Sequence, residues 1–194
     1  MSESLDDKVR RLIAEEVAIV PYDPSWPVSF ARERDHLRAC LPSELVGRIE
    51  HFGSTAVPGL AAKPVVDLLV EVTDLERAQQ KIVPILEAQR YDYLWRPTRG
   101  DDGEPFYAWF IKRDAASGVR THHIHMVERH FPHWDSLFFR DYLIGHPETA
   151  REYERLKRHL ANDVPHDRVA YTRGKAAFID RVTEQAKRHF NGPQ

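Results

Sequence analysis

One acidic residue, Asp67, lies inside an almost wholly apolar, β-branched run from Val65 to Val72. A run of this kind is typical of a strand that is buried on both faces. Burying a carboxylate costs on the order of several kcal/mol unless a positive charge or hydrogen-bond donors meet it. Asp67 is therefore either the carboxylate of a functional site or the buried partner of a structural arginine or lysine.

A glycine–serine pair, Gly53 and Ser54, ends the short strand predicted over residues 48–52. If a helical turn follows, its free backbone N–H groups and the Ser54 hydroxyl would form an anion site suited to a phosphate. Asp67 on the next strand could hold the Mg²⁺ that a triphosphate brings with it. This pairing fits nucleotidyl transfer, in which the catalyst positions phosphates and neutralises charge. Lys63, between the two, could meet a phosphate or pair with Asp67.

Two histidines lie on one side of a later strand predicted over residues 119–127. Alternation along that strand places Ile124 and Met126 on one face and His123 and His125 on the other. The two histidines are either ordinary sheet residues or residues of the functional site. In the site they would be metal ligands or a base, because a histidine with a pKa near neutrality can take a proton from an acceptor hydroxyl.

The surrounding pattern predicts the elements that must position these residues. The predicted fold is α+β: a mixed sheet flanked by helices over residues 16–130, and then a helical region over 131–194 that closes over a cleft. Residues 1–15 are predicted as a charged arm. Strands are predicted over residues 17–20, 48–52, 65–72, 91–95, 106–112 and 119–127, and the last two are expected to form a hairpin. One helix is predicted to end at Leu41. Further helices are predicted over 75–89, with a break at Pro84, and over 134–143, 147–160 and 167–190.

Composition excludes several classes of function. The 194 residues carry 28 Lys and Arg against 30 Asp and Glu, a net charge of −2, so the chain lacks the excess of basic residues needed to grip a long nucleic acid. The single cysteine, Cys40, excludes an internal disulfide and a cysteine-based zinc site. No apolar run is long enough for a membrane span, and the charged N-terminus is unlike a signal peptide, so we expect a cytoplasmic protein that does not bind membranes. Neither a P-loop nor a dinucleotide-binding glycine motif is present.

The string HFGSTAVPGLAAKPVVDLLVEV, residues 51–72, resembles the signature of the GrpB family, a branch of the nucleotidyltransferase superfamily. The resemblance covers most of the chain. VPYDPSWP is similar to the opening turn of the family, HHIHMVE to its His-x-His strand, and FFRDYLIGHPETAREYERLKRHLA and DRVAYTRGKAAFI to its C-terminal helices. The resemblance implies a nucleotidyltransferase-like fold.

The chain departs from the superfamily at the second carboxylate. The superfamily pattern has a Gly-Ser turn, then a strand with two alternate carboxylates, and a third carboxylate from a neighbouring strand. Leu69 stands where the second is needed, and Glu71, four residues from Asp67, is about 13 Å away along a strand. If the strand that carries His123 and His125 is the one that supplies the third carboxylate in the superfamily, the site has one carboxylate and two imidazoles. That ligand set moves the metal preference from Mg²⁺ toward Mn²⁺ or Zn²⁺.

The helix motifs add candidate residues for substrate binding. In related enzymes such helices bind the triphosphate or the acceptor. Tyr171 and Lys175 lie one helical turn apart and are the preferred pair for binding the phosphate and the base or ribose of the nucleotide. For every charged residue of these motifs the alternative is a solvated surface charge or an ion pair between helices. The matching residues are Arg140, Asp141, Lys157, Arg168, Tyr171 and Lys175.

The resulting hypothesis is an enzyme that binds a nucleoside triphosphate, or a related phosphorylated small molecule, with a divalent metal and transfers a nucleotidyl group to a small acceptor. One alternative is a non-catalytic nucleotide- or coenzyme-binding module that supports a partner enzyme, because similar domains occur fused to dephospho-coenzyme A kinases. Another is a metal-dependent phosphoesterase that uses the two histidines.

Overall fold

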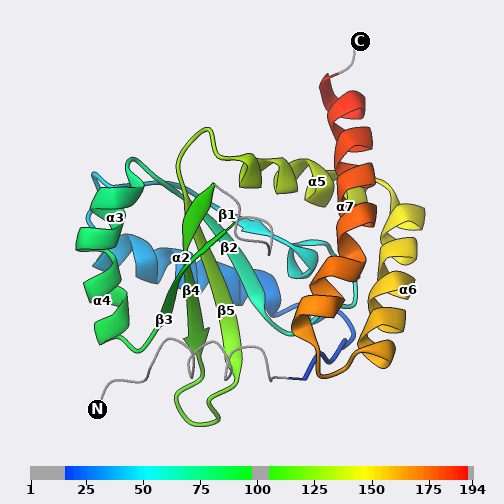
Figure 1. The fold of residues 1–194 in the computed structure, drawn as a ribbon, viewed down its shortest axis with the longest axis horizontal. Helices are drawn as coiled ribbons and strands as arrows, with labels where there is room; N and C mark the ends of the chain where they lie inside the picture. Colours follow the sequence, from blue (N-terminus) through cyan, green and yellow to red (C-terminus); the bar gives the residue numbers. More distant parts are fainter. Residues whose placement is uncertain (1–15, 98–104, 192–194) are drawn as a thin grey trace.

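A five-stranded mixed sheet forms the centre of the fold, with the strand order β1-β2-β5-β4-β3 (Figure 1). β2 and β5 are parallel, and every other neighbouring pair is antiparallel. The computed structural model describes residues 16–97 and 105–191, so the predicted arm over 1–15 and most of the loop after β3 lie outside the described residues. The strands are β1 (Val46–Phe52), β2 (Val66–Val72), β3 (Asp92–Pro97), β4 (Phe106–Arg113) and β5 (Arg120–Val127).

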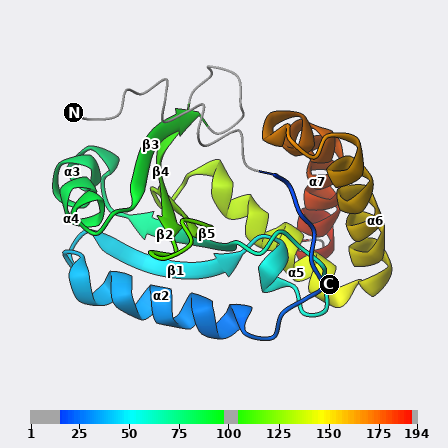
Figure 2. The ribbon, with the colours of Figure 1, turned by 90° about the horizontal axis from the view of Figure 1, so that it is seen from below.

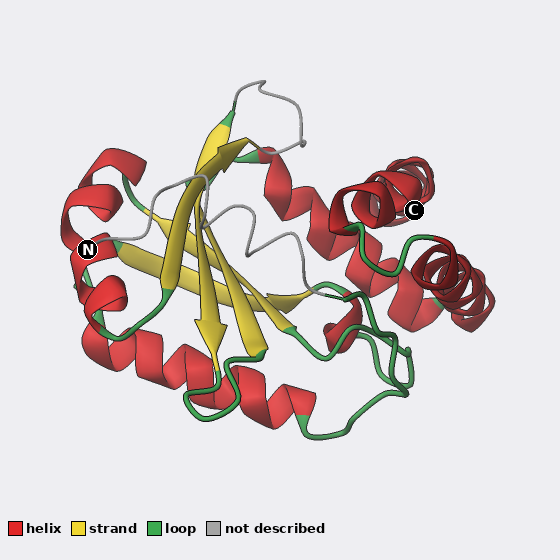
Figure 3. Ribbon diagram, turned by 60° about the horizontal axis from the view of Figure 1, so that its bottom comes forward, coloured by secondary structure: helices red, strands yellow, loops and turns green. Residues whose placement is uncertain are grey.

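Within residues 16–97 and 105–191, six α-helices and two 3₁₀ turns accompany the sheet. Three helices pack on one face of it, and three follow it in the chain as a C-terminal group (Figures 2 and 3). The first three are α2 (Trp26–Cys40), α3 (Leu75–Lys81) and α4 (Val83–Ala88), the last three are α5 (Ser136–Gly145), α6 (Pro147–Asp163) and α7 (Arg168–Asn191), and the turns are η1 (Ser54–Ala56) and η2 (Pro132–Asp135). The α+β architecture agrees with the expectation from sequence.

The alternation of the central strands separates two cores. Leu68 and Val70 of β2, with Ile124 and Met126 of β5, face the side covered by α2, α3 and α4. The opposite face buries Leu69 with aromatic residues of β4 and with Trp134. Because residues two apart share a face, this second face also receives Asp67, His123 and His125.

Local signals explain the boundaries of α3 and α4. Asp74 caps α3 by accepting a hydrogen bond from the backbone N–H of Arg77, at 2.8 Å. The expected break at Pro84 separates α3 from α4, since proline lacks the N–H that a continuous helix would use. The predicted strand over 17–20 is wrong: it is reduced to a single bridge between Val20 and Ala62, and Pro21 has no N–H with which to extend the ladder.

No helix in the described parts of the chain combines the length and the apolar character needed to cross a bilayer.

Candidate functional site

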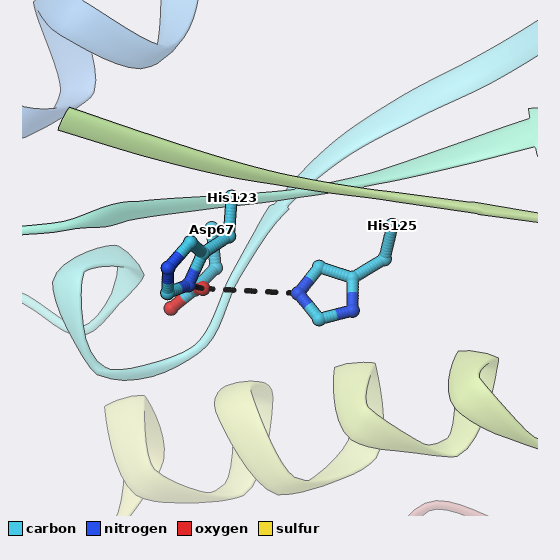
Figure 4. A group of neighbouring side chains, drawn as sticks. All are labelled: Asp67, His123 and His125. Atoms are coloured by element: carbon cyan, nitrogen blue, oxygen red, sulfur yellow. Dashed lines mark hydrogen bonds and ion pairs between the residues drawn. The ribbon is translucent and has the colours of Figure 1, made fainter. Parts of the chain in front are cut away.

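The register between β2 and β5 brings one carboxylate and two imidazoles together. Asp67 lies opposite His123, and Leu69 lies opposite His125, in the parallel ladder. Nδ1 of His123 is 3.1 Å from Oδ1 of Asp67, and Nε2 of His125 is 3.9 Å from the same oxygen (Figure 4). One possible ligand atom from each residue lies within 4.8 Å of the other two. These three residues, called the Asp67 cluster below, form the centre of the candidate site.

The Asp67 cluster is largely withdrawn from water. The side chains of His123, His125 and Asp67 are 10%, 12% and 26% exposed. Burial alone would raise the pKa of Asp67, but the hydrogen bond from His123 and the neighbouring imidazole of His125 outweigh it and hold that pKa below its usual range. Burial lowers the pKa of His123 to about 3, and it also lowers the pKa of His125. At neutral pH the cluster therefore presents one carboxylate and two neutral imidazoles, the protonation state that metal binding requires.

The hydrogen-bond partner of Asp67 is an imidazole rather than an arginine or a lysine. Two atoms of the cluster, Nε2 of His123 and Nδ1 of His125, are buried and have no hydrogen-bond partner among the described residues. Buried polar atoms without partners are uncommon in proteins. The cluster thus retains capacity for a further ligand.

The turn after β1 fits closely against the carboxylate. Gly53 has φ +72°, and a Cβ atom placed there would lie 2.6 Å from Oδ2 of Asp67. The short helical turn expected after this glycine is present as η1, one 3₁₀ turn of three residues. The Ser54 side chain is hydrogen-bonded to Tyr153 of α6. Gly53 therefore gives the carboxylate room, and Ser54 links the turn to the C-terminal helices.

The position of the second superfamily carboxylate belongs to the core. Leu69 is completely buried against Phe52, Tyr107 and Trp109. Glu71 lies further along β2 and forms an ion pair with Arg48, at 3.2 Å between Oε2 and Nε. Neither residue can add a second acidic ligand to the Asp67 cluster.

Two of the predicted phosphate-binding lysines meet at one aromatic ring. Nζ of Lys175 and Nζ of Lys63 lie 4.5 Å and 5.2 Å from the ring centroid of Tyr171. Within the described part of the chain neither ammonium group has a carboxylate at ion-pair distance. Burial lowers the pKa of Lys63 to about 7, with Lys175 adding repulsion, and it lowers the pKa of Lys175 to about 8. The pair is a desolvated concentration of positive charge, and Asp67 is close enough to influence both pKa values.

A third lysine, Lys157 of α6, matches the helix motifs but lies outside the pair preferred from the sequence. It is fully buried, donates a hydrogen bond to the carbonyl oxygen of Ala61, and lies 4.8 Å from the ring centroid of Tyr153. Burial and the neighbouring Lys175 lower its pKa to about 7. The signal that could have singled it out is the spacing Tyr153-x-x-x-Lys157, which recurs one helix later as Tyr171-x-x-x-Lys175.

Arg140, also predicted to bind phosphate, is occupied elsewhere. Its guanidinium donates to Glu50 at 3.3 Å, to the carbonyl oxygen of His51 at 2.7 Å and to Asp141 at 2.7 Å. The contacts to Glu50 and His51 fasten α5 to β1. The structure does not bring Arg140 into contact with the Asp67 cluster, and its phosphate role stays a prediction.

His133 is a neighbour of the cluster that the sequence did not indicate. Its ring centroid lies 5.5 Å from that of His125 and 4.5 Å from that of Tyr107. Burial lowers its pKa to about 3, and His125 and Arg96 contribute in the same direction. The 3₁₀ turn η2 places it there, and no strand or helix periodicity marks it in the sequence.

Comparisons with known proteins agree on one family. The GrpB protein family matches residues 16–185. A UPF0157 protein of Pseudomonas aeruginosa is 38% identical over 178 residues, covering 89% of this chain and 68% of the relative. The crystal structure of the conserved protein GrpB from Enterococcus faecalis is 31% identical and has a TM-score of 0.72, covering 89% of this chain and 99% of that one.

A dephospho-CoA kinase of Mycolicibacterium paratuberculosis is 29% identical over 189 residues, but the match covers 46% of that protein and 88% of this chain. The family match, the relative and the solved structure each cover most of the chain, and the family match includes both strands that carry the Asp67 cluster. The chain is therefore a member of the GrpB family.

Proposed function

We propose that the Asp67 cluster binds one divalent transition-metal ion together with the phosphates of a nucleoside triphosphate, and that the protein transfers the nucleotidyl group to a small acceptor. The observation that carries this proposal is the juxtaposition of two unlike charge groups. A single carboxylate with two neutral imidazoles lies within electrostatic range of two partly buried lysines that lack carboxylate partners among the described residues.

The three side chains fit a metal ion. Ligands bonded to Zn²⁺ at the usual distances are about 3.3 Å apart in a tetrahedral arrangement. The contacts of 3.1 Å and 3.9 Å to Oδ1 of Asp67 bracket that separation. One carboxylate with two imidazoles favours Mn²⁺ or Zn²⁺ over Mg²⁺, which prefers oxygen ligands. When bound, such an ion would supply charge neutralisation at a phosphate oxygen.

Lys63 and Lys175 are suited to the phosphate chain. Moving an ammonium group out of water disfavours its charged form, which accounts for the lowered pKa values of both lysines. A bound polyphosphate would reverse that effect by favouring the protonated amines. Tyr171 is buried, and both ammonium groups lie over its ring, which keeps them close together.

In the proposed reaction an acceptor oxygen forms a bond to the α-phosphorus while the bond from that phosphorus to the bridging oxygen breaks. The charge that develops on the departing pyrophosphate would be stabilised by Lys63 and Lys175. The proton of the acceptor hydroxyl would pass to solvent water, because a neutral imidazole that gives the lone pair of one ring nitrogen to the metal carries its proton on the other nitrogen and cannot accept a second.

The buried Leu69 limits this chemistry to one ion. Two-metal sites need bridging carboxylates between ions about 4 Å apart. Asp67 alone cannot supply them, and the imidazoles do not bridge two ions in this way. The proposal is therefore a one-metal nucleotidyltransferase, in contrast to the three-carboxylate pattern of the superfamily.

The test measures binding and turnover separately. Calorimetry with Mn²⁺ and each of the four common nucleoside triphosphates should detect binding, and a pyrophosphate-release assay with a panel of small acceptors should detect transfer. Asp67→Asn should abolish both, whereas Asp163→Asn, which removes an exposed carboxylate on α6, should change neither. Wild-type activity that persists in Asp67→Asn would refute the proposed site.

The alternative, a non-catalytic nucleotide- or coenzyme-binding module, is favoured by the similarity to part of a dephospho-CoA kinase. The same assays separate the two functions. Tight binding of a nucleotide or of dephospho-coenzyme A, without pyrophosphate release for any metal or acceptor, would select the binding module.

A further inference from the structure

A cavity of about 340 Å³ lies between the β4–β5 turn, the segment that begins at Glu16 and the first turn of α7. Figure 1 shows these three segments at the same end of the molecule. Its volume is within the range of small-molecule sites. Lys63, whose ammonium group is within electrostatic range of Asp67, also lines this cavity.

The lining is strongly basic. Lys63, Arg120 and Arg168 contribute positive charge, Arg113 is ion-paired with Asp92, and among the described lining residues Glu16 contributes a carboxylate. Guanidinium groups remain protonated in proteins, so most of this charge is fixed at every physiological pH.

Two of the arginines are held in place by the fold. Arg113 donates to Asp92 at 2.9 Å and to the carbonyl oxygen of Gly118 at 2.8 Å, which fixes its guanidinium at the β4–β5 turn. Arg120 opens β5 and is 3% exposed, so its charge lies at the wall of the cavity rather than in bulk solvent. Charges that are withdrawn from water interact more strongly with an anion than surface charges do.

The rest of the wall is apolar. Val65 and Val119, with Pro64 and Ala18, line the same cavity. A basic wall beside an apolar one matches a ligand that has an acidic group on a compact apolar body. A long nucleic acid does not match it, because the chain as a whole has a net charge of −2.

We propose that this cavity binds a small organic anion, a carboxylate or a phosphate monoester with a compact apolar body, as a second ligand beside the Asp67 cluster. Its identification as the acceptor of the nucleotidyl group rests on the proposed function. The binding itself does not depend on that function, because the cavity contains none of the three residues of the Asp67 cluster.

The probes are benzoate and phenyl phosphate, titrated into the whole, metal-free chain by calorimetry, with benzyl alcohol as the neutral comparison. We expect at least one anion to bind and benzyl alcohol to bind far more weakly. Binding of benzoate alone would assign a carboxylate ligand, and binding of phenyl phosphate alone would assign a phosphate monoester. Equal binding of the neutral probe, or no binding of either anion, would overturn the proposal.

A matched pair at Val119 locates the site. Val119 is 58% exposed at the mouth of the cavity, so substitution there should leave the fold intact. Val119→Asp should weaken anion binding about tenfold relative to Val119→Asn, because the two differ by one negative charge near the basic wall. Equal affinities in the two variants would show that the anion binds elsewhere.

Two further variants separate this proposal from the proposed function. Arg168→Gln should weaken anion binding, whereas Asp67→Asn should retain it while losing Mn²⁺ binding. Absence of Mn²⁺ and nucleotide binding in the wild type, with anion binding intact, would refute only the proposed function. Nucleotide binding without any effect of the Val119 pair on benzoate or phenyl phosphate would refute only the anion cavity.

Discussion

Gly53 and Asp67 are fitted against each other, since a Cβ atom on Gly53 would lie 2.6 Å from Oδ2 of the carboxylate. The backbone of Gly53 also has φ +72°, which side chains rarely adopt. Both constraints act at the strand-end turn next to the Asp67 cluster. The glycine is therefore needed for the conformation of the turn and for the space that the carboxylate occupies.

Gly53→Ala should destabilise the protein by about 1–3 kcal/mol through backbone strain, and should also displace Asp67. Gly118→Ala is the matched control, because Gly118 has φ +69° but a methyl group there would meet no atom of another described segment within 4 Å. Urea unfolding measures the loss of stability that backbone strain causes in both variants. Only Gly53→Ala should also weaken Mn²⁺ binding, and equal Mn²⁺ affinity in both variants would contradict the close fit.

The free energy of unfolding should fall as the pH is lowered from 6.5. His123 has a folded-state pKa of about 3 against an ordinary value of 6.5, so between these values the unfolded chain binds more protons than the folded one. The contribution of His123 to stability is therefore present above pH 6.5 and is lost as the pH falls toward 3. Each pH unit in this window removes up to about 1.4 kcal/mol for one such group.

His123→Asn should flatten this decline between pH 6.5 and about 4, above the ordinary pKa of Asp67, because asparagine does not titrate. His159→Asn serves as the control, since His159 has a 72% exposed side chain on α6 and lies far from the cluster in the sequence. The measurement is urea unfolding at several pH values. A slope for His123→Asn equal to that of His159→Asn would show that His123 is not buried in its neutral form.

Lys175→Met should stabilise the ligand-free protein at pH 7 and weaken nucleotide binding. Burial lowers the pKa of Lys175 from 10.5 to about 8, so the unfolded chain binds more protons between these values, and stability rises with pH across that interval. The variant should show a smaller rise on going from pH 7 to about pH 10. A functional site commonly carries such a cost in stability.

Lys187→Met on the same helix is the comparison for Lys175→Met. Lys187 pairs with Asp135 and Glu184, which raise its pKa, so its removal should not stabilise the protein. Chemical denaturation and nucleotide titration of both variants decide the matter. Destabilisation by Lys175→Met, with unchanged nucleotide affinity, would assign Lys175 to the core instead of the phosphate site.

Lys157→Met should destabilise the protein by about 1–3 kcal/mol, because it removes the donor to the buried carbonyl of Ala61. Glu154 accepts a hydrogen bond from the N–H of the same residue at 3.3 Å, so α6 holds both backbone groups of Ala61. A double-mutant cycle with Glu154→Gln should therefore give a coupling energy of about 0.5 kcal/mol or more. Arg151→Met, exposed on the same helix, is the control, and purely additive effects of Lys157→Met and Glu154→Gln would rule out a joint role.

Much of the local structure follows from short-range patterns. The alternation from Arg120 to Val127 shows that His123 and His125 share a face, and the proline at 84 divides the helical stretch that follows β2. The apolar run around Asp67 marks that acid as unusual before any coordinates are known. These features depend on neighbours within a few positions, so the sequence carries them directly.

The partners of these residues depend on contacts between distant segments. Asp67 and His123 are 56 positions apart, and only the parallel pairing of β2 with β5 places them side by side. The segment over 17–20 has the composition of a strand, but only Val20 forms a bridge, with Ala62. Lys157 of α6 donates a hydrogen bond to Ala61, which lies 96 positions earlier in the chain. The sequence by itself determined which side chains could do chemistry and which face of a strand they occupy. Only the tertiary structure decided which of these side chains meet. Strand register and helix packing are set by burial over the whole core, and the periodicity of hydrophobic residues within one segment does not reveal them.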